Sequence, residues 1–235
     1  MQLLVAAFKY LTVWSDFTDD KPTPELVGRA AGFFPLVGLV LGLLLALSNH
    51  VLSPYLEPEI LGVAVIGILI VATGARHLHG VKQTFDELGA QAPVTGGRTN
   101  EGLGFAAVVL IILFKSSAAD SIDEILSLSL LLTPLLARWA FLIFLYGYGA
   151  RFDEISRLIS EQVKFSPLLT STAATLALTV YLLGRKGLWI ALIVSLFALF
   201  ARGLLHRRHG IVSQANIDAT VELTEALCLI LLASL

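Results

Sequence analysis

Hydrophobic residues gather into long, nearly continuous runs, and short polar segments separate each run from the next. A bilayer core about 30 Å thick needs roughly 20 apolar residues per helix, and tilt or local thinning lets shorter segments cross. The runs predict an all-α fold, a polytopic membrane helix bundle of about seven transmembrane helices in one domain over residues 1–235. Residues 1–14 are expected to form a short interfacial or re-entrant helix. The seven predicted spans are 29–49, 59–75, 102–119, 126–147, 167–184, 188–205 and 219–235.

The composition supports this reading. Hydrophobic residues make up 56% of the chain and charged residues only 14%, which is typical of a membrane protein and not of a soluble globule. The small net charge of −2 argues against a nucleic-acid partner. The single Cys228 lies in the last apolar run, so a disulfide framework is excluded.

Basic residues are distributed unevenly between the two sides that these spans define. Eleven Lys and Arg residues fall on one side, whereas the other side has only Arg185 and Lys186. Because basic loops are retained in the cytoplasm, we expect a cytoplasmic N-terminus and an external C-terminus. The long polar loops 76–101, 148–166 and 206–218 are then cytoplasmic, and a substrate pocket is expected at that membrane surface.

The densest group of titratable side chains lies in residues 73–88. His77 and His79 share a face if this segment is extended but lie about 200° apart if it is helical, so a metal pair and a merely polar surface both remain open. Asp86 and Glu87 could hold Mg²⁺ together with substrate phosphates, although a loop carboxylate is often simply solvated.

Three acids open the last apolar run. Asp218, Glu222 and Glu225 are spaced by four and three residues, which puts them on one helical face. Acids near a bilayer predict a polar cavity, a cation or basic partners against them. Alternatively, these acids could stabilise the N-terminus of the last helix through the helix dipole. That role suits Asp218, the nearest of the three to the helix start, best and Glu225 least.

Two basic residues interrupt other apolar runs. Arg138 is deep in its run and predicts a carboxylate or phosphate partner. Lys115 is near the end of its run, where snorkelling to the interface is the simpler expectation. The glycine-rich segment 95–104 contains Arg98 and leads into a helix, an arrangement that suits an anion.

These motifs together resemble one known family, the cobalamin synthases, or adenosylcobinamide-GDP ribazoletransferases. The similarity covers nearly the whole chain, from Tyr10-Leu11-Thr12 onward. The family's central motif is matched by Thr73, Gly74, His77, Gly80, Thr84 and Asp86, and its last motif by Gly210, Glu222 and Glu225. At three positions where the family has acids, this chain has His79, Gln83 and Ala215.

The resemblance implies a membrane transferase of the cytoplasmic (inner) membrane of a bacterium or archaeon. It would join adenosylcobinamide-GDP and α-ribazole, or its phosphate, to give adenosylcobalamin (phosphate) and GMP. The implied cofactor is Mg²⁺, held by Asp86, Glu222 and Glu225, and the implied catalytic residues are His77 and Asp86. Implied substrate-binding residues are His79, Gln83, Arg98, Asn100, Arg138 and Arg151.

Implied partners are the two substrates, the lipid bilayer and other enzymes of the cobalamin pathway. Two alternatives stay open at this point. One is a catalytically diverged member that binds a corrinoid or scaffolds other enzymes. The other is a small transporter, against which the clustering of polar residues on one side argues.

Overall fold

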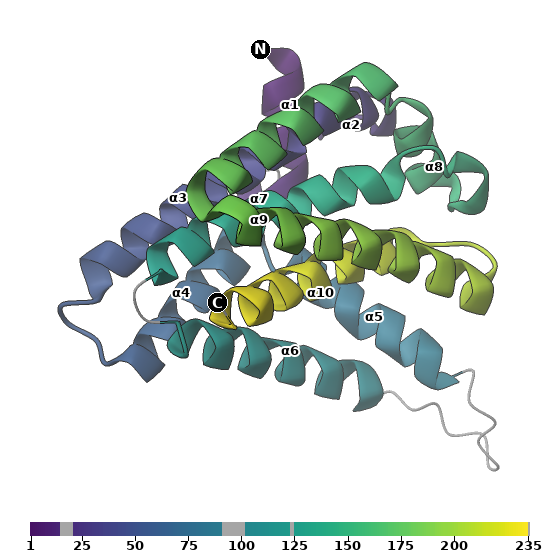
Figure 1. The fold of residues 1–235 in the computed structure, drawn as a ribbon. Coiled ribbons are helices and arrows are strands. Elements are labelled where there is room, and N and C mark those ends of the chain that lie inside the picture. The colour runs from purple at the N-terminus through teal and green to yellow at the C-terminus, as the bar shows by residue number, and fades with distance from the viewer. Residues whose placement is uncertain (15–20, 91–101, 123–124, 235) are drawn as a thin grey trace.

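The computed structural model describes residues 1–14, 21–90, 102–122 and 125–234, and these parts of the chain form a helical bundle (Figure 1). The all-α prediction is confirmed. The α-helices are α1 (Gln2–Leu11), α2 (Pro24–Ala30), α3 (Phe34–Leu52), α4 (Pro58–Ala72), α5 (Arg76–Ala90), α6 (Gly102–Asp120), α7 (Leu126–Leu145), α8 (Glu154–Glu161), α9 (Phe165–His209) and α10 (Gln214–Ala233). Short 3₁₀ segments, η2 (Ala31–Phe33) and η3 (Gly149–Arg151), precede α3 and α8.

The predicted count of seven spans is not confirmed. Within the described residues, four helical segments are long and apolar enough to cross a membrane: Pro24–Leu52, α6, α7 and α9. A fifth is possible if α4 and α5, which meet at 90°, form one broken span. α10 has sufficient length, but its three acids keep it from qualifying on composition.

The 45-residue α9 is two helices joined at a kink. Gly184 has φ 58° and ψ −138°, a conformation that favours glycine, and the chain folds back there (Figure 1). A Cβ on Gly187 would lie 2.5 Å from the Thr179 carbonyl oxygen, so glycine lets the two arms approach closely. This turn lies between the predicted spans 167–184 and 188–205.

The polar segment predicted as a loop over 76–101 begins with a helix. α5 is amphipathic, and its apolar side packs against α10 and α6 through Leu78 and Val81. The sequence interpretation was wrong here because it searched for apolar runs, whereas α5 has one apolar face. Residues 91–101, the rest of that predicted loop, lie outside the described residues.

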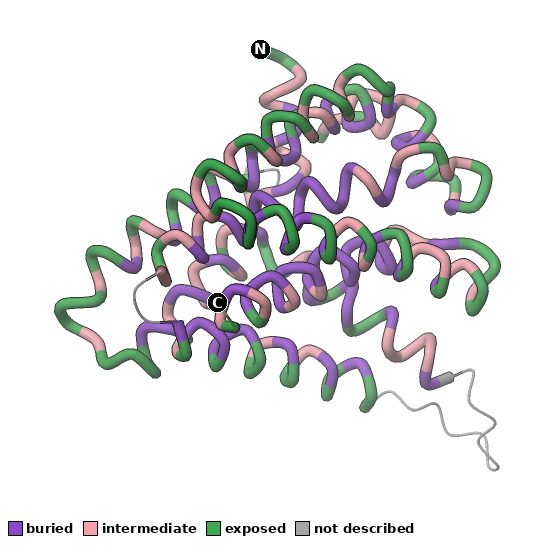
Figure 2. The backbone as a smooth tube through the Cα atoms, viewed as in Figure 1, coloured by how far each residue is buried: buried purple, intermediate pink, exposed green. Residues whose placement is uncertain are grey.

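α7 forms the centre of the bundle. Most of its side chains are buried, as are those of α10, while the outward faces of α3, α6 and α9 expose large apolar residues (Figure 2). Such faces suit contact with lipid. α3 packs directly on α7, because a Cβ at Gly38 or Gly42 would lie within 2.4 Å of the carbonyl oxygens of Pro134 and Leu131.

The connections gather at opposite ends of the bundle. The α3–α4 connection and the C-terminus lie toward the left of Figure 1, and the α9–α10 connection and α8 lie toward the right. The right end carries the basic residues of 151–164 and 202–208.

Candidate functional site

One face of α10 carries three buried acids, each of which meets a base on a different helix. Asp218, Glu222 and Glu225 are at most 4% exposed. Ser213 starts α10 with a capping box, accepting from the Asn216 N–H while the Asn216 side chain accepts from the Ser213 N–H. The spacing of four and three residues then brings the acids to the side facing α5, α6 and α7.

Two of these acids form a buried ion cluster. Lys115 Nζ donates to Glu222 Oε1 at 2.6 Å and to Glu225 Oε2 at 2.5 Å, and Arg138 donates to the other oxygen of Glu225. Both bases are fully buried. Lys115 is therefore not a snorkelling side chain, contrary to the expectation, whereas Arg138 has the expected carboxylate partner.

This ion cluster is balanced in charge, with two carboxylates facing two cations. Removing ions from water costs several kcal/mol each, and only close pairing with additional hydrogen bonds offsets that cost. The arrangement leaves little need for a metal at Glu222 and Glu225, because Lys115 already lies between them.

A second pair lies one turn earlier on α10. His77 Nδ1, on α5, is 3.2 Å from Asp218 Oδ1, and Gln214 Nε2 donates to the same carboxylate oxygen at 3.3 Å. Gly80 lets α5 approach, since a Cβ there would lie 2.6 Å from the Asp218 Cβ. With the proton of Nδ1 donated to Asp218, His77 Nε2 is left as an acceptor, and no described residue bonds to it.

Polar atoms of Tyr10 and Arg76 lie buried near this pair. The Arg76 guanidinium stacks 4.6 Å over the Tyr10 ring and donates to the Tyr10 carbonyl oxygen. Burial raises the pKa of Tyr10 well above its usual value, and the Asp218 charge adds to this effect. A contact with the Gln214 side chain opposes part of this rise, and Arg76 Nε is buried with no hydrogen-bond partner within the described parts of the chain, so the α1–α5–α10 junction contains an unused donor.

The predicted metal ligand Asp86 lies elsewhere. Its Oδ1 accepts from the Gly104 N–H at 2.8 Å, at the start of α6, and its Oδ2 accepts from Lys82 at 2.8 Å. Gly104 and Lys115 are separated by eleven residues of α6, about 16 Å of helix. Asp86, Glu222 and Glu225 are not brought together, and no group of three or more His, Cys, Asp or Glu among the described residues could hold a metal.

The predicted substrate-binding residues are dispersed. His79 and Gln83 lie on the exposed face of α5, where Gln83 donates to Glu87, so His79 does not pair with the buried His77. Arg151 is exposed beside His206, with 2.5 Å between Nη1 and Nε2. Arg138 is buried in the ion cluster, and Arg98 and Asn100 lie outside the described residues.

Two residues with positioning roles were missed from the sequence. Asp153 accepts from the Ser156 N–H and from the Gln214 N–H, so one carboxylate caps both α8 and α10. Arg202 donates to the carbonyl oxygens of Phe144 and Tyr146 at 3.0 Å and caps the end of α7. An Asp ahead of a helical pattern is a signal that could have identified Asp153.

Comparisons with known proteins agree on one family. The family model described as cobalamin-5-phosphate synthase matches residues 3–233. An adenosylcobinamide-GDP ribazoletransferase of Geotalea daltonii is 30% identical, over 100% of this chain and 98% of that protein. Proteins of the same name from Syntrophobacter fumaroxidans and Pseudomonas savastanoi pv. phaseolicola are also 30% identical, over 72% and 91% of this chain and 73% and 91% of those proteins.

No solved structure matches the chain. The family match begins within α1 and extends through α10, so it includes both the ion cluster and the His77–Asp218 pair. The chain belongs to the cobalamin-5-phosphate synthase family.

Proposed function

We propose that this chain catalyses the ribazoletransferase step that closes the nucleotide loop of cobalamin. Adenosylcobinamide-GDP and α-ribazole, or its phosphate, give adenosylcobalamin (phosphate) and GMP. The observation that carries the proposal is the family match along residues 3–233, together with relatives named for this reaction.

His77 is the proposed general base. Asp218 holds the imidazole through Nδ1, which leaves Nε2 to take the proton of the attacking ribose hydroxyl. The hydroxyl oxygen then bonds to the phosphorus nearest the corrinoid, and the bond from that phosphorus to the GMP oxygen breaks. Because His77 is only 1% exposed, α1 or α5 must shift to admit the substrate.

Arg151 is the proposed contact for the pyrophosphate. It is exposed and lies with His206 at the same end of the bundle as the start of α10. A guanidinium binds phosphate oxygens through two parallel hydrogen bonds, which would fix the substrate and offset its charge. His79 and Gln83, exposed on α5, are proposed as further substrate contacts.

Magnesium dependence remains a proposal from the sequence, and the predicted ligand set does not fit it as a whole. Glu222 and Glu225 are engaged by Lys115 and Arg138. Asp86 is the partly exposed member of the set, and Mg²⁺ commonly uses one or two carboxylates plus substrate phosphates. We therefore propose Asp86 as its protein ligand and derive no chemical step through the metal.

The proposed location is the cytoplasmic membrane, with the N-terminus and the His77 end of the bundle in the cytoplasm. The support is the excess of Lys and Arg at that end and the apolar exposed faces of α3, α6 and α9. Association with other enzymes of the cobalamin pathway is proposed on the family resemblance alone.

The direct test uses purified full-length protein in detergent with adenosylcobinamide-GDP, α-ribazole and Mg²⁺. We expect GMP release together with a corrinoid product that contains the ribazole base. Release of GMP no faster than in the absence of the protein would contradict transferase activity. Such a result, with corrinoid binding retained, would support the catalytically diverged alternative that the replaced acids at His79, Gln83 and Ala215 suggest.

A further inference from the structure

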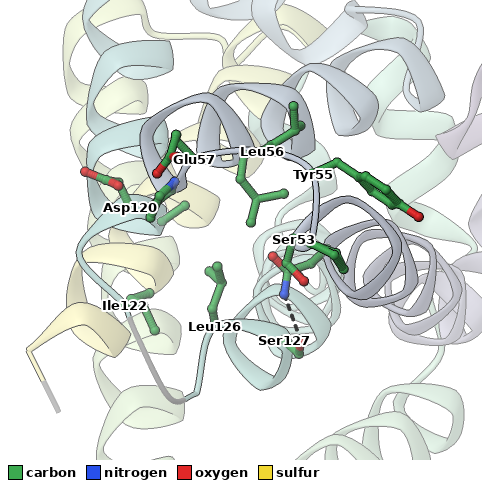
Figure 3. A pocket seen from close by; sticks show the side chains of 13 residues that line it. Ser53, Tyr55, Leu56, Glu57, Asp120, Ile122, Leu126 and Ser127 are labelled. Carbon is green, nitrogen blue, oxygen red and sulfur yellow. Dashed lines mark hydrogen bonds between the residues drawn. The ribbon is translucent and has the colours of Figure 1, made fainter.

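A cavity lies at the end of the bundle opposite His77. It has a volume of about 600 Å³ and lies between the α3–α4 connection, the end of α6 and the start of α7 (Figure 3). This volume suits a small molecule or a lipid head group, not a bare ion. None of the proposed catalytic or substrate-binding residues lines it.

Oxygen atoms dominate the polar lining of this cavity. Glu57 and Asp120 lie on one side in Figure 3, and Ser53 and Ser127 lie on the other, while Leu56 and Leu126 project between them. Carboxylate and hydroxyl oxygens accept hydrogen bonds from a cation. The leucines provide the apolar wall that a ligand with a hydrocarbon part would contact.

Asn49 gives an independent indication that a ligand donates hydrogen bonds here. It lines the cavity but is only 8% exposed, and its Nδ2 donates to Ser127 Oγ at 2.9 Å. That bond fixes the amide, and its Oδ1 is buried with no partner among the described residues. A buried acceptor left unpaired is destabilising, so a donor from a ligand would stabilise it.

The charge around the cavity also favours a cation. Segments 30–75 and 116–137 contain no Lys or Arg. Asp120 closes α6, where the negative end of the helix disfavours a carboxylate, and neither Asp120 nor Glu57 forms an ion pair within the described chain. Glu57 precedes α4, where the helix N-terminus partly stabilises its charge.

We propose that this cavity binds the ammonium group of a small amine, with Asp120, Glu57 and Asn49 Oδ1 as acceptors. An ammonium has three donors and no acceptor, which matches a polar lining composed mainly of oxygen acceptors. The amine can come from an aminolipid head group, since the cavity opens beside apolar faces, or from a free amine in solution.

The test compares lipids with and without a free amine in the head group. Full-length protein in detergent is mixed with phosphatidylethanolamine, N-acetylated phosphatidylethanolamine or phosphatidylglycerol, and bound lipid is counted by native mass spectrometry. A separate arm measures the shift in thermal unfolding caused by ethanolamine alone. We expect retention of phosphatidylethanolamine over the other two lipids, and about tenfold weaker retention in the Asp120→Asn variant.

Glu59→Gln is the matched control, because Glu59 is an exposed acid near the start of α4 that does not line the cavity. It should retain lipid as the wild type does. Stabilisation by ethanolamine that depends on Asp120, without lipid preference, would identify a soluble amine as the source. Equal retention of the acetylated lipid together with no stabilisation by ethanolamine, or no effect of Asp120→Asn on either arm, would overturn the proposal.

Discussion

Lys115 Nζ lies 2.6 Å from Glu222 Oε1, inside a bundle whose outer faces are apolar. The same ammonium group contacts Glu225, and Arg138 completes the ion cluster. Each buried charge in the cluster is compensated by its partners. Replacing one of these residues with a neutral residue therefore leaves an uncompensated buried charge. Breaking such a cluster is far more costly than replacing the whole of it.

The Lys115→Met variant should therefore lose about 3–5 kcal/mol of stability, because two carboxylates would share one remaining cation. The measurement is the thermal unfolding midpoint of detergent-solubilised protein. Lys164→Met, which alters an exposed lysine at the start of α9, is the control and should be nearly neutral. Adding Glu222→Gln to Lys115→Met should restore part of the loss, and a further loss would contradict the paired arrangement.

The His77–Asp218 pair should control the rate of transfer. His77→Ala should lower kcat by about 10²–10⁴-fold through loss of the general base. Asp218→Asn should also lower kcat although the protein still folds. The amide N–H of the new side chain can donate to His77 Nδ1, which places the ring proton on Nε2 and removes the acceptor that the base needs. GMP release measures both, and His50→Gln, an exposed histidine at the other end of the bundle, should retain wild-type activity. Wild-type kcat in Asp218→Asn would remove Asp218 from this role.

The sequence predicted that the three acids of α10 and Arg138 needed partners but could not identify those partners. The spacing of Asp218, Glu222 and Glu225 indicated one helical face that required a cation or basic residues. Lys115 and Arg138, however, lie 107 and 87 positions away in the chain. Which helices meet depends on the packing of the whole bundle, including glycine contacts such as that of Gly80 with α10, and no local pattern contains this information.

Tyr10 predicts a pH dependence at the alkaline end. Its pKa is raised by burial, so the folded state keeps the phenol protonated while the unfolded chain ionises near pH 10. The stability contribution is fully present below about pH 10 and decreases as the pH rises further. Unfolding midpoints between pH 8 and 11 should fall less steeply in Tyr10→Phe. Tyr181→Phe, at an 85% exposed position, should keep the wild-type slope.

The proposed Mg²⁺ dependence can distinguish Asp86 from Glu222 as the metal ligand. If Asp86 contacts the metal, Asp86→Asn should raise the Mg²⁺ concentration for half-maximal activity by about tenfold. Glu222→Gln should leave that concentration unchanged, because Glu222 is bound to Lys115. This concentration does not depend on how much protein is folded, so it separates metal binding from stability. A large shift in Glu222→Gln alone would restore Glu222 as a ligand.

Gly80 connects the packing of α5 with the geometry of the His77–Asp218 pair. In Gly80→Ala the new methyl group would lie 2.6 Å from the Asp218 Cβ and 2.8 Å from the Ala215 carbonyl oxygen. α5 must then move away from α10, which should cost about 1–3 kcal/mol and lengthen the contact from His77 to Asp218. Transfer activity per folded molecule should fall along with the unfolding midpoint. Gly67→Ala, in α4 with nothing within 4 Å of the added methyl group, should leave transfer activity unchanged and should not lower the unfolding midpoint, because alanine favours a helix over glycine. An equal fall of both quantities in the two variants would contradict the role of the α5–α10 contact.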